Sequence, residues 1–176
     1  MKRILLTASA IFLLFFANST ANAAGVGILD VEKIVKESSA MRDIQNKVSK
    51  RQDEYQKEVT KQQSKLESEQ KRIEGKKTIL SKDAFDKEVV GFEKKVDELK
   101  TFVDKKQNSL KKASMEAMSK VNDKIKDIIA DIANEKGLDV IVPAGQTLYY
   151  KDDFDISDEV LKKLDKQITK VDVKFE

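Results

Sequence analysis

Four aspartates close together in the sequence, Asp152, Asp153, Asp155 and Asp158, are of the residue type that binds calcium. A calcium loop of the EF-hand type spans twelve residues with a central Gly and a terminal Glu, and this stretch has neither at the required place. Aspartates also cap helices and initiate turns. We therefore expect these four to serve the local fold, and we predict no metal site.

The side chains that most often perform catalysis are missing from the chain. It contains no Cys and no His, so it has no thiol nucleophile and no imidazole to activate a serine. A phosphate-binding loop of the GxxxxGK type is also absent, which argues against ATP-driven action. We expect a protein that is not an enzyme and that uses no cofactor.

The first 23 residues have the pattern of a secretory signal peptide. Lys2 and Arg3 precede an apolar run over positions 4–17, and Ala21 to Ala23 form a small-x-small cleavage site. The apolar run is too short for a transmembrane helix and has no stop-transfer sequence after it. We predict that residues 1–23 are removed and that the rest of the chain is exported.

Two stretches of the exported part have the apolar spacing of paired helices. Apolar residues spaced alternately by four and three run from Phe85 to Ala117, and a half-apolar seam of the same spacing runs from Val31 to Leu80. Between them, Gly75 breaks the helical pattern, and Ser81 or Asp83 is suited to cap the returning helix. The spacing predicts an antiparallel helical hairpin over residues 31–112, an arm with its tip near 75–83.

The remaining segments predict a small body at the base of the arm. The apolar row shifts phase near Ala113, which turns the helix toward a new partner. Residues 25–29 are predicted as a strand, 138–142 and 147–150 as a β-hairpin, and 155–164 as the start of a last helix. We therefore assign residues 24–30 and 113–170 to the body and expect residues 171–176 to be a frayed tail.

Such a small body has open strand edges. Three short strands cannot close a sheet, and a symmetric assembly that shares strands between subunits would cover their edges. We therefore predict a homo-oligomer. The candidates for its core are the apolar strand residues, namely Val26, Ile28, Val140, Ile141, Val142, Leu148 and Tyr149.

The predicted fold is α+β and mostly helical, with a long hairpin projecting from a small β body. The opening ILDVEKIVKESSA, the segment GLDVIVPAGQTLYY and the closing DISDEVLKKL follow one another in the order of the Skp/OmpH family of periplasmic chaperones, which this chain resembles. The likeness covers essentially the whole exported part, although the central arms match in architecture only.

The resemblance implies a periplasmic homotrimer in which three arms project from a shared β-barrel. Such a protein holds unfolded outer-membrane proteins in the cavity between its arms, without ATP, before they insert into the membrane. Two features differ from well-studied members, which are strongly basic. This chain is nearly balanced, with 34 Lys and Arg against 31 Asp and Glu, and residues 171–176 extend past the usual end.

Two groups of arm residues are candidates for contact with a partner. Apolar residues off the helical seam could touch apolar client segments, or they could pack within the hairpin: Ile44, Ile79, Val90 and Phe102. A basic cluster near the tip could contact anionic membrane, lipopolysaccharide or an acidic client, or could serve solubility: Lys71, Arg72, Lys76, Lys77 and Lys82.

Two other classes of function fit Lys-rich helices. A nucleic-acid binder is disfavoured by export, by the balanced charge and by the lack of a basic patch interleaved with aromatic residues. A structural coiled-coil spacer of the cell envelope remains the alternative to a client-holding chaperone. The discriminating property is the suppression of aggregation of an unfolded protein.

Overall fold

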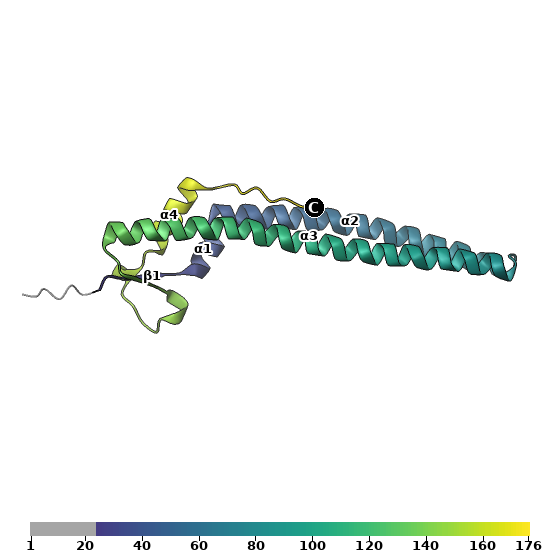
Figure 1. The fold of residues 1–176 in the computed structure, drawn as a ribbon, viewed down its shortest axis with the longest axis horizontal. Coiled ribbons are helices and arrows are strands. Elements are labelled where there is room, and N and C mark those ends of the chain that lie inside the picture. Colours follow the sequence, from purple (N-terminus) through teal and green to yellow (C-terminus); the bar gives the residue numbers. More distant parts are fainter. Residues whose placement is uncertain (1–23) are drawn as a thin grey trace, which may run out of the picture.

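The computed structural model describes residues 24–176, which form a small body with a long helical arm (Figure 1). The predicted signal segment, residues 1–23, lies outside the described residues. The elements in chain order are β1 (Val26–Leu29), α1 (Val31–Glu37), α2 (Ser39–Lys76), α3 (Lys82–Lys136), β2 (Val140–Pro143), the 3₁₀ turns η1 (Ala144–Gln146) and η2 (Asp152–Phe154), and α4 (Ser157–Gln167). The predicted mostly helical α+β fold is confirmed.

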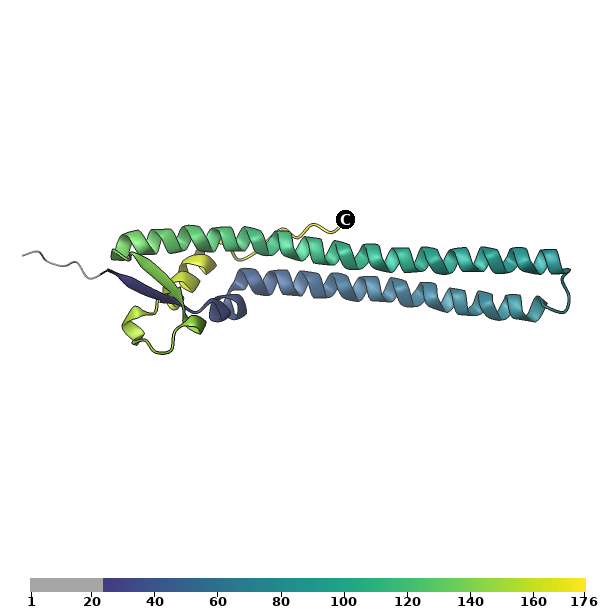
Figure 2. The same cartoon turned by 60° about the horizontal axis from the view of Figure 1, so that its bottom comes forward.

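The arm consists of α2 and α3, which run antiparallel and lie side by side to the tip (Figure 2). Helix α2 has 38 residues, and at about 1.5 Å per residue it extends roughly 57 Å. The Oγ of Ser81 accepts a hydrogen bond of 3.4 Å from the backbone N–H of Ala84, so this residue caps α3. Helix α3 is longer, with 55 residues, and its second half runs into the body.

The first helix is interrupted at Ser38, where the sequence predicts a continuous helix. Ser38 is buried and extended, and its Oγ accepts a hydrogen bond of 3.2 Å from the backbone N–H of Met41. The next N–H, that of Ser39, donates to the carboxylate of Asp165 in α4 at 2.8 Å. The interruption separates α1 from α2 and lets α1 pack its buried Ile34 into the body.

The two strands pair in parallel, with Val26 opposite Val140 and Leu29 opposite Pro143. The predicted β-hairpin between residues 138–142 and 147–150 is wrong, because β2 turns into η1 directly after Pro143 and residues 147–150 form no strand. Helices α1, α2 and α3 form the long crossover that parallel strands need. The sheet of the described residues has these two strands.

The hydrophobic core lies where the base of the arm meets the body. Residues of α3 beyond the predicted phase shift, such as Val121 and Ile132, pack there against α4 and the start of α2, as that shift predicts. The buried members of the core are Leu29, Ile34, Ala40, Met41, Ile44, Ala117, Val121, Ile128, Ile132, Ile156, Val160, Leu164 and Val171. No helix in the described part of the chain is long and apolar enough to cross a membrane.

Residues 171–176, the tail, lie along the arm after α4 (Figure 1). The expectation of a frayed tail is wrong, since Val171 is buried in the core and Val173 packs against it. The tail is held by hydrogen bonds to both α2 and α3 and by one ion pair to α3. It is therefore part of the folded structure.

Candidate functional site

The aspartate cluster serves the start of α4. The Oδ1 of Asp155 accepts a hydrogen bond of 2.7 Å from the backbone N–H of Ser157, and Asp158 pairs with the ammonium of Lys33 at 2.6 Å. This pairing raises the pKa of Lys33. Across residues 24–176, no group of three His, Cys, Asp or Glu side chains is placed to hold a metal ion. The candidate functional features are accordingly surfaces of the arm and the body.

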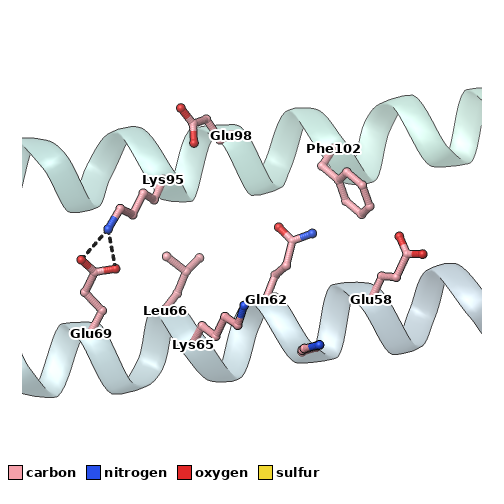
Figure 3. Close-up of a pocket in the computed structure, with 9 residues that line it drawn as sticks. Glu58, Gln62, Lys65, Leu66, Glu69, Lys95, Glu98 and Phe102 are labelled. Carbon is pink, nitrogen blue, oxygen red and sulfur yellow. Dashed lines mark hydrogen bonds and ion pairs between the residues drawn. The ribbon is translucent and has the colours of Figure 1, made fainter.

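A pocket of about 800 Å³ opens between α2 and α3 in the middle of the arm (Figure 3). Two of its lining side chains, Leu66 and Phe102, are apolar, and the rest are polar or charged. The complete lining is Glu58, Lys61, Gln62, Lys65, Leu66, Glu69, Lys95, Glu98 and Phe102. The pocket thus combines apolar surface with flanking charges.

The pocket exists because the helical seam is polar at this level. Gln62 and Glu69 occupy seam positions that apolar residues fill in a tightly packed coiled coil. The ammonium of Lys95 on α3 reaches across to both carboxylate oxygens of Glu69, at 2.6 and 2.9 Å (Figure 3). An ion pair therefore joins the two helices where apolar packing is reduced.

Nearer the tip, Glu88 of α3 joins the helices by two further ion pairs. Its carboxylate oxygens accept hydrogen bonds from Lys76 at 2.8 Å and from Arg72 at 2.9 Å, both on α2. The hydrogen bond from Lys76 and, to a smaller extent, that from Arg72 lower the pKa of Glu88. Glu88 in turn raises the pKa of Arg72. Two ion pairs near the surface thus join α2 and α3 close to the tip.

The four candidate client-contact residues lie in three different environments. Ile79 in the tip turn is 79% exposed and Val90 on α3 is 64% exposed. Phe102 is half-buried and lines the mid-arm pocket. Ile44 is wrong as a client contact, because it is fully buried in the core with Leu164 and Val171. Its helical phase places it off the seam, and the flank it occupies is covered by the body.

The basic tip divides into residues with and without an ion pair to Glu88. Lys71, Lys77 and Lys82 are exposed. Arg72 and Lys76 form the ion pairs with Glu88, so part of the positive charge that the sequence shows is compensated within the arm. The three exposed lysines remain available to an external anionic group.

The candidate oligomer residues lie on and beside the two strands. Ile28 is buried, and the half-buried members are Val26, Ile141 and Val142. The exposed members are Val140, Leu148 and Tyr149. An apolar pocket of about 820 Å³ is lined by Val26, Ile28, Val142, residues 146–151 and Phe154.

That pocket includes Phe154, which sequence reasoning missed. Its side chain is 43% exposed and lies in η2. The surrounding aspartates led to an interpretation of the segment as a polar turn. A large aromatic residue inside such a turn is the signal that could have identified it, because turns seldom need one.

Comparisons with known proteins match nearly the whole described chain. The sequence model of a family described as outer membrane protein (OmpH-like) matches residues 25–164. An uncharacterized protein of Aquifex aeolicus (strain VF5) is 32% identical over 138 residues, which are 78% of this chain and 84% of that protein.

A solved structure has the same fold. It is that of a proposed outer membrane chaperone (OmpH-like) from Caulobacter crescentus CB15, with a TM-score of 0.81, 20% sequence identity, and coverage of 93% of this chain and 97% of that chain. At this identity the likeness shows the fold alone. The family match ends at residue 164, before the tail.

The different environments of Ile44 and Ile79 predict different stabilities for the same substitution. We expect Ile44→Ala to lower the free energy of unfolding by about 2–5 kcal/mol, because it removes buried methyl groups and leaves a cavity. Ile79→Ala, the matched control, should change it by less than about 0.5 kcal/mol. Urea unfolding followed by circular dichroism measures both, and equal effects would contradict the assignment of Ile44 to the core.

The ion pairs of Glu88 predict that the tip loosens in acid. Because the folded-state pKa of Glu88 lies below the ordinary value of 4.5, its charge stabilises the paired tip above that pH, and the stabilisation is lost as the pH falls through the lowered value. Spin labels on cysteines replacing Lys71 and Lys87 should show a broader distance distribution on acidification. Glu88→Gln should broaden it already at neutral pH, and exposed Glu93→Gln should not. A distribution insensitive to Glu88→Gln would refute this role.

Proposed function

Because the chain belongs to the OmpH-like family, we propose that it is a periplasmic holdase chaperone that keeps unfolded outer-membrane proteins from aggregating without ATP. One observation carries the proposal: the arm stands clear of the body and leaves apolar side chains accessible among charges. These include Ile79, Val90 and the pocket residue Phe102. Residues 1–23 would direct its export.

The arm surface is suited to holding a client reversibly. Full burial of one exposed Ile or Val side chain contributes roughly 1.5–3 kcal/mol, so a single contact is weak. Several such contacts on one client add through their high effective concentration, while each remains easy to release. This combination favours capture of unfolded chains without a nucleotide-driven release step.

A trimeric assembly with a shared β-barrel forms the second part of the proposal. One edge of β2 pairs with β1, and its other edge has no strand partner within the described residues. Leu148, which is fully exposed, and Tyr149, which is 78% exposed, line the apolar pocket of about 820 Å³ next to the strands. Subunits that share strands would cover this surface and enclose a cavity between their arms. The trimeric order follows the family resemblance.

The exposed lysines of the tip form a third part. Lys71, Lys77 and Lys82 would contact anionic headgroups of membrane lipid or lipopolysaccharide, since clustered cations are attracted to such surfaces. Glu88 compensates one of the two positive charges of Arg72 and Lys76. The attraction therefore rests mainly on the three lysines that form no ion pair with Glu88.

A light-scattering experiment tests the holdase activity. We expect the purified chain to suppress aggregation of a urea-unfolded outer-membrane β-barrel protein at about one oligomer per client, without nucleotide. A variant with Ile79→Ser and Val90→Ser should protect less well, because both changes remove exposed apolar surface while Ser and Val have similar helix propensities. Glu93→Gln, another exposed arm substitution, is the matched control.

Unchanged aggregation in the presence of a folded oligomer would contradict the holdase proposal. In that case the chain would be assigned to the structural spacers of the cell envelope, which need no client. Full protection by the Ile79 and Val90 variant would show instead that clients bind a different surface of the arm.

The exposed residues beside β2 predict a sensitive oligomer interface. We expect Leu148→Asp to convert the oligomer to monomers, because a charge would be buried in the shared apolar surface. Ile79→Asp, at the exposed tip of the arm, should leave the oligomer intact. Sedimentation equilibrium measures both masses. Trimers that survive Leu148→Asp would argue against this surface as the subunit contact.

A further inference from the structure

The tail is bound to α2 through its backbone. The N–H of Val171 donates a hydrogen bond of 2.8 Å to the Oδ2 of Asp43, and the carbonyl oxygen of Val171 accepts one of 2.7 Å from the ammonium of Lys47. The hydrogen bond from Lys47 and, to a smaller extent, that from the Val171 N–H lower the pKa of Asp43. Such bonds recognise an extended backbone and place little demand on the side chain of the bound residue.

The end of the tail reaches α3. The N–H of Glu176 donates to the Oγ of Ser109 at 3.0 Å, and its carboxylate pairs with Lys112 at 2.8 Å. The guanidinium of Arg51 on α2 lies 5.0 Å from the ring centroid of Phe175. We call the surface formed by Asp43, Lys47, Arg51, Ser109 and Lys112 the tail-binding face.

The tail has the side-chain alternation of an amphipathic β-strand. Val171 is buried, and Val173 and Phe175 are half-buried on the arm. The intervening Asp172 and Lys174 are exposed and form an ion pair with each other at 3.8 Å. The tail-binding face thus holds an extended segment in which every second side chain is apolar.

The surface continues beyond the end of the tail. A pocket of about 480 Å³ lies next to Glu176 and is lined by Phe102, Lys105, Lys106, Asn108, Ser109 and Lys112. Phe102 also lines the mid-arm pocket, so the two pockets adjoin along the arm. A segment longer than the tail could follow the same direction toward the tip.

We propose that the tail-binding face is a binding site for extended client segments with alternating apolar residues, and that the tail is a built-in competitor for it. The client class rests on the proposed holdase function, because strands of membrane β-barrels alternate apolar and polar residues. The backbone contacts of Asp43 and Lys47 would serve many client sequences equally. The tail fills the site when no client is present.

Because the tail is covalently attached, it competes with a client segment for the tail-binding face at a high effective concentration. A short flexible link gives an effective concentration on the order of millimolar. If the tail by itself binds the face with a Kd of about 0.1 mM, it weakens the binding of any competing segment by about tenfold, and its release should restore that factor. Clients that present many suitable segments would displace it, and isolated short peptides would not.

The test compares two full-length variants in the binding of a labelled peptide. Val173→Asp with Phe175→Asp removes the two half-buried apolar contacts of the tail and should release it, whereas Asp172→Asn with Lys174→Gln changes only its exposed side chains. A fluorescein-labelled peptide TKVDVKFE, copied from residues 169–176, should bind the release variant about tenfold more tightly than the control variant by fluorescence anisotropy. The rearranged peptide TKDKVVFE, in which the apolar residues are consecutive, should bind both weakly.

Equal binding of TKVDVKFE to both variants, or equal binding of the two peptides, would overturn the proposal. If the release variant loses its helical content, hydrogen exchange on the unsubstituted chain tests whether a client displaces the tail. The amides of Val171 and Glu176 should be protected in the free chain and lose protection when an unfolded β-barrel client is bound. Protection that persists in the client complex would equally overturn the proposal.

The aggregation assay separates this proposal from the proposed function. If the chain suppresses aggregation but releasing the tail does not tighten peptide binding, the holdase function stands and the tail-binding site fails. If peptide binding responds to the tail but aggregation is unaffected, the face is a peptide site and the holdase function fails.

Discussion

Burial of the second half of α3 against the body is the interaction on which the rest of the structure depends. Val121, Ile128 and Ile132 are fully buried there with residues of α1, α2 and α4. The outer arm has no comparable core, since the α2 side of its seam alternates apolar and polar residues. A projecting hairpin of this length can keep its direction only if its base is anchored, and this core provides the anchor.

The arm gains its accessibility from the same limited packing. Where apolar seam residues give way to Gln62 and Glu69, the helices are joined by the ion pair of Lys95, and a pocket opens beside Phe102. Ion pairs between exposed side chains contribute about 0–1 kcal/mol each, so they position the helices without holding them tightly. Tight apolar packing would have buried the side chains that a client could touch.

The exposure of the candidate client-contact residues could be predicted from the sequence only where it follows from local position. Ile79 in the tip turn and Val90 on the outer flank of α3 are exposed because no other segment reaches the end of the arm. Ile44 occupies a similar flank by helical phase but is buried, because the body covers the base of α2. Helical phase gives the direction of a side chain on its own helix and contains no information about a third segment.

The sequence by itself determined the helical hairpin, its tip, and the turn of α3 toward a body, because helical spacing and capping depend on residues a few positions apart. Only the tertiary structure decided the parallel pairing of β1 with β2 and the binding of the tail to the arm. The first joins Val26 to Val140 and the second joins Asp43 to Val171, both across more than 100 residues. At such separations, the packing of the helices determines which surface remains accessible to an apolar strand. The local sequence pattern does not specify that surface.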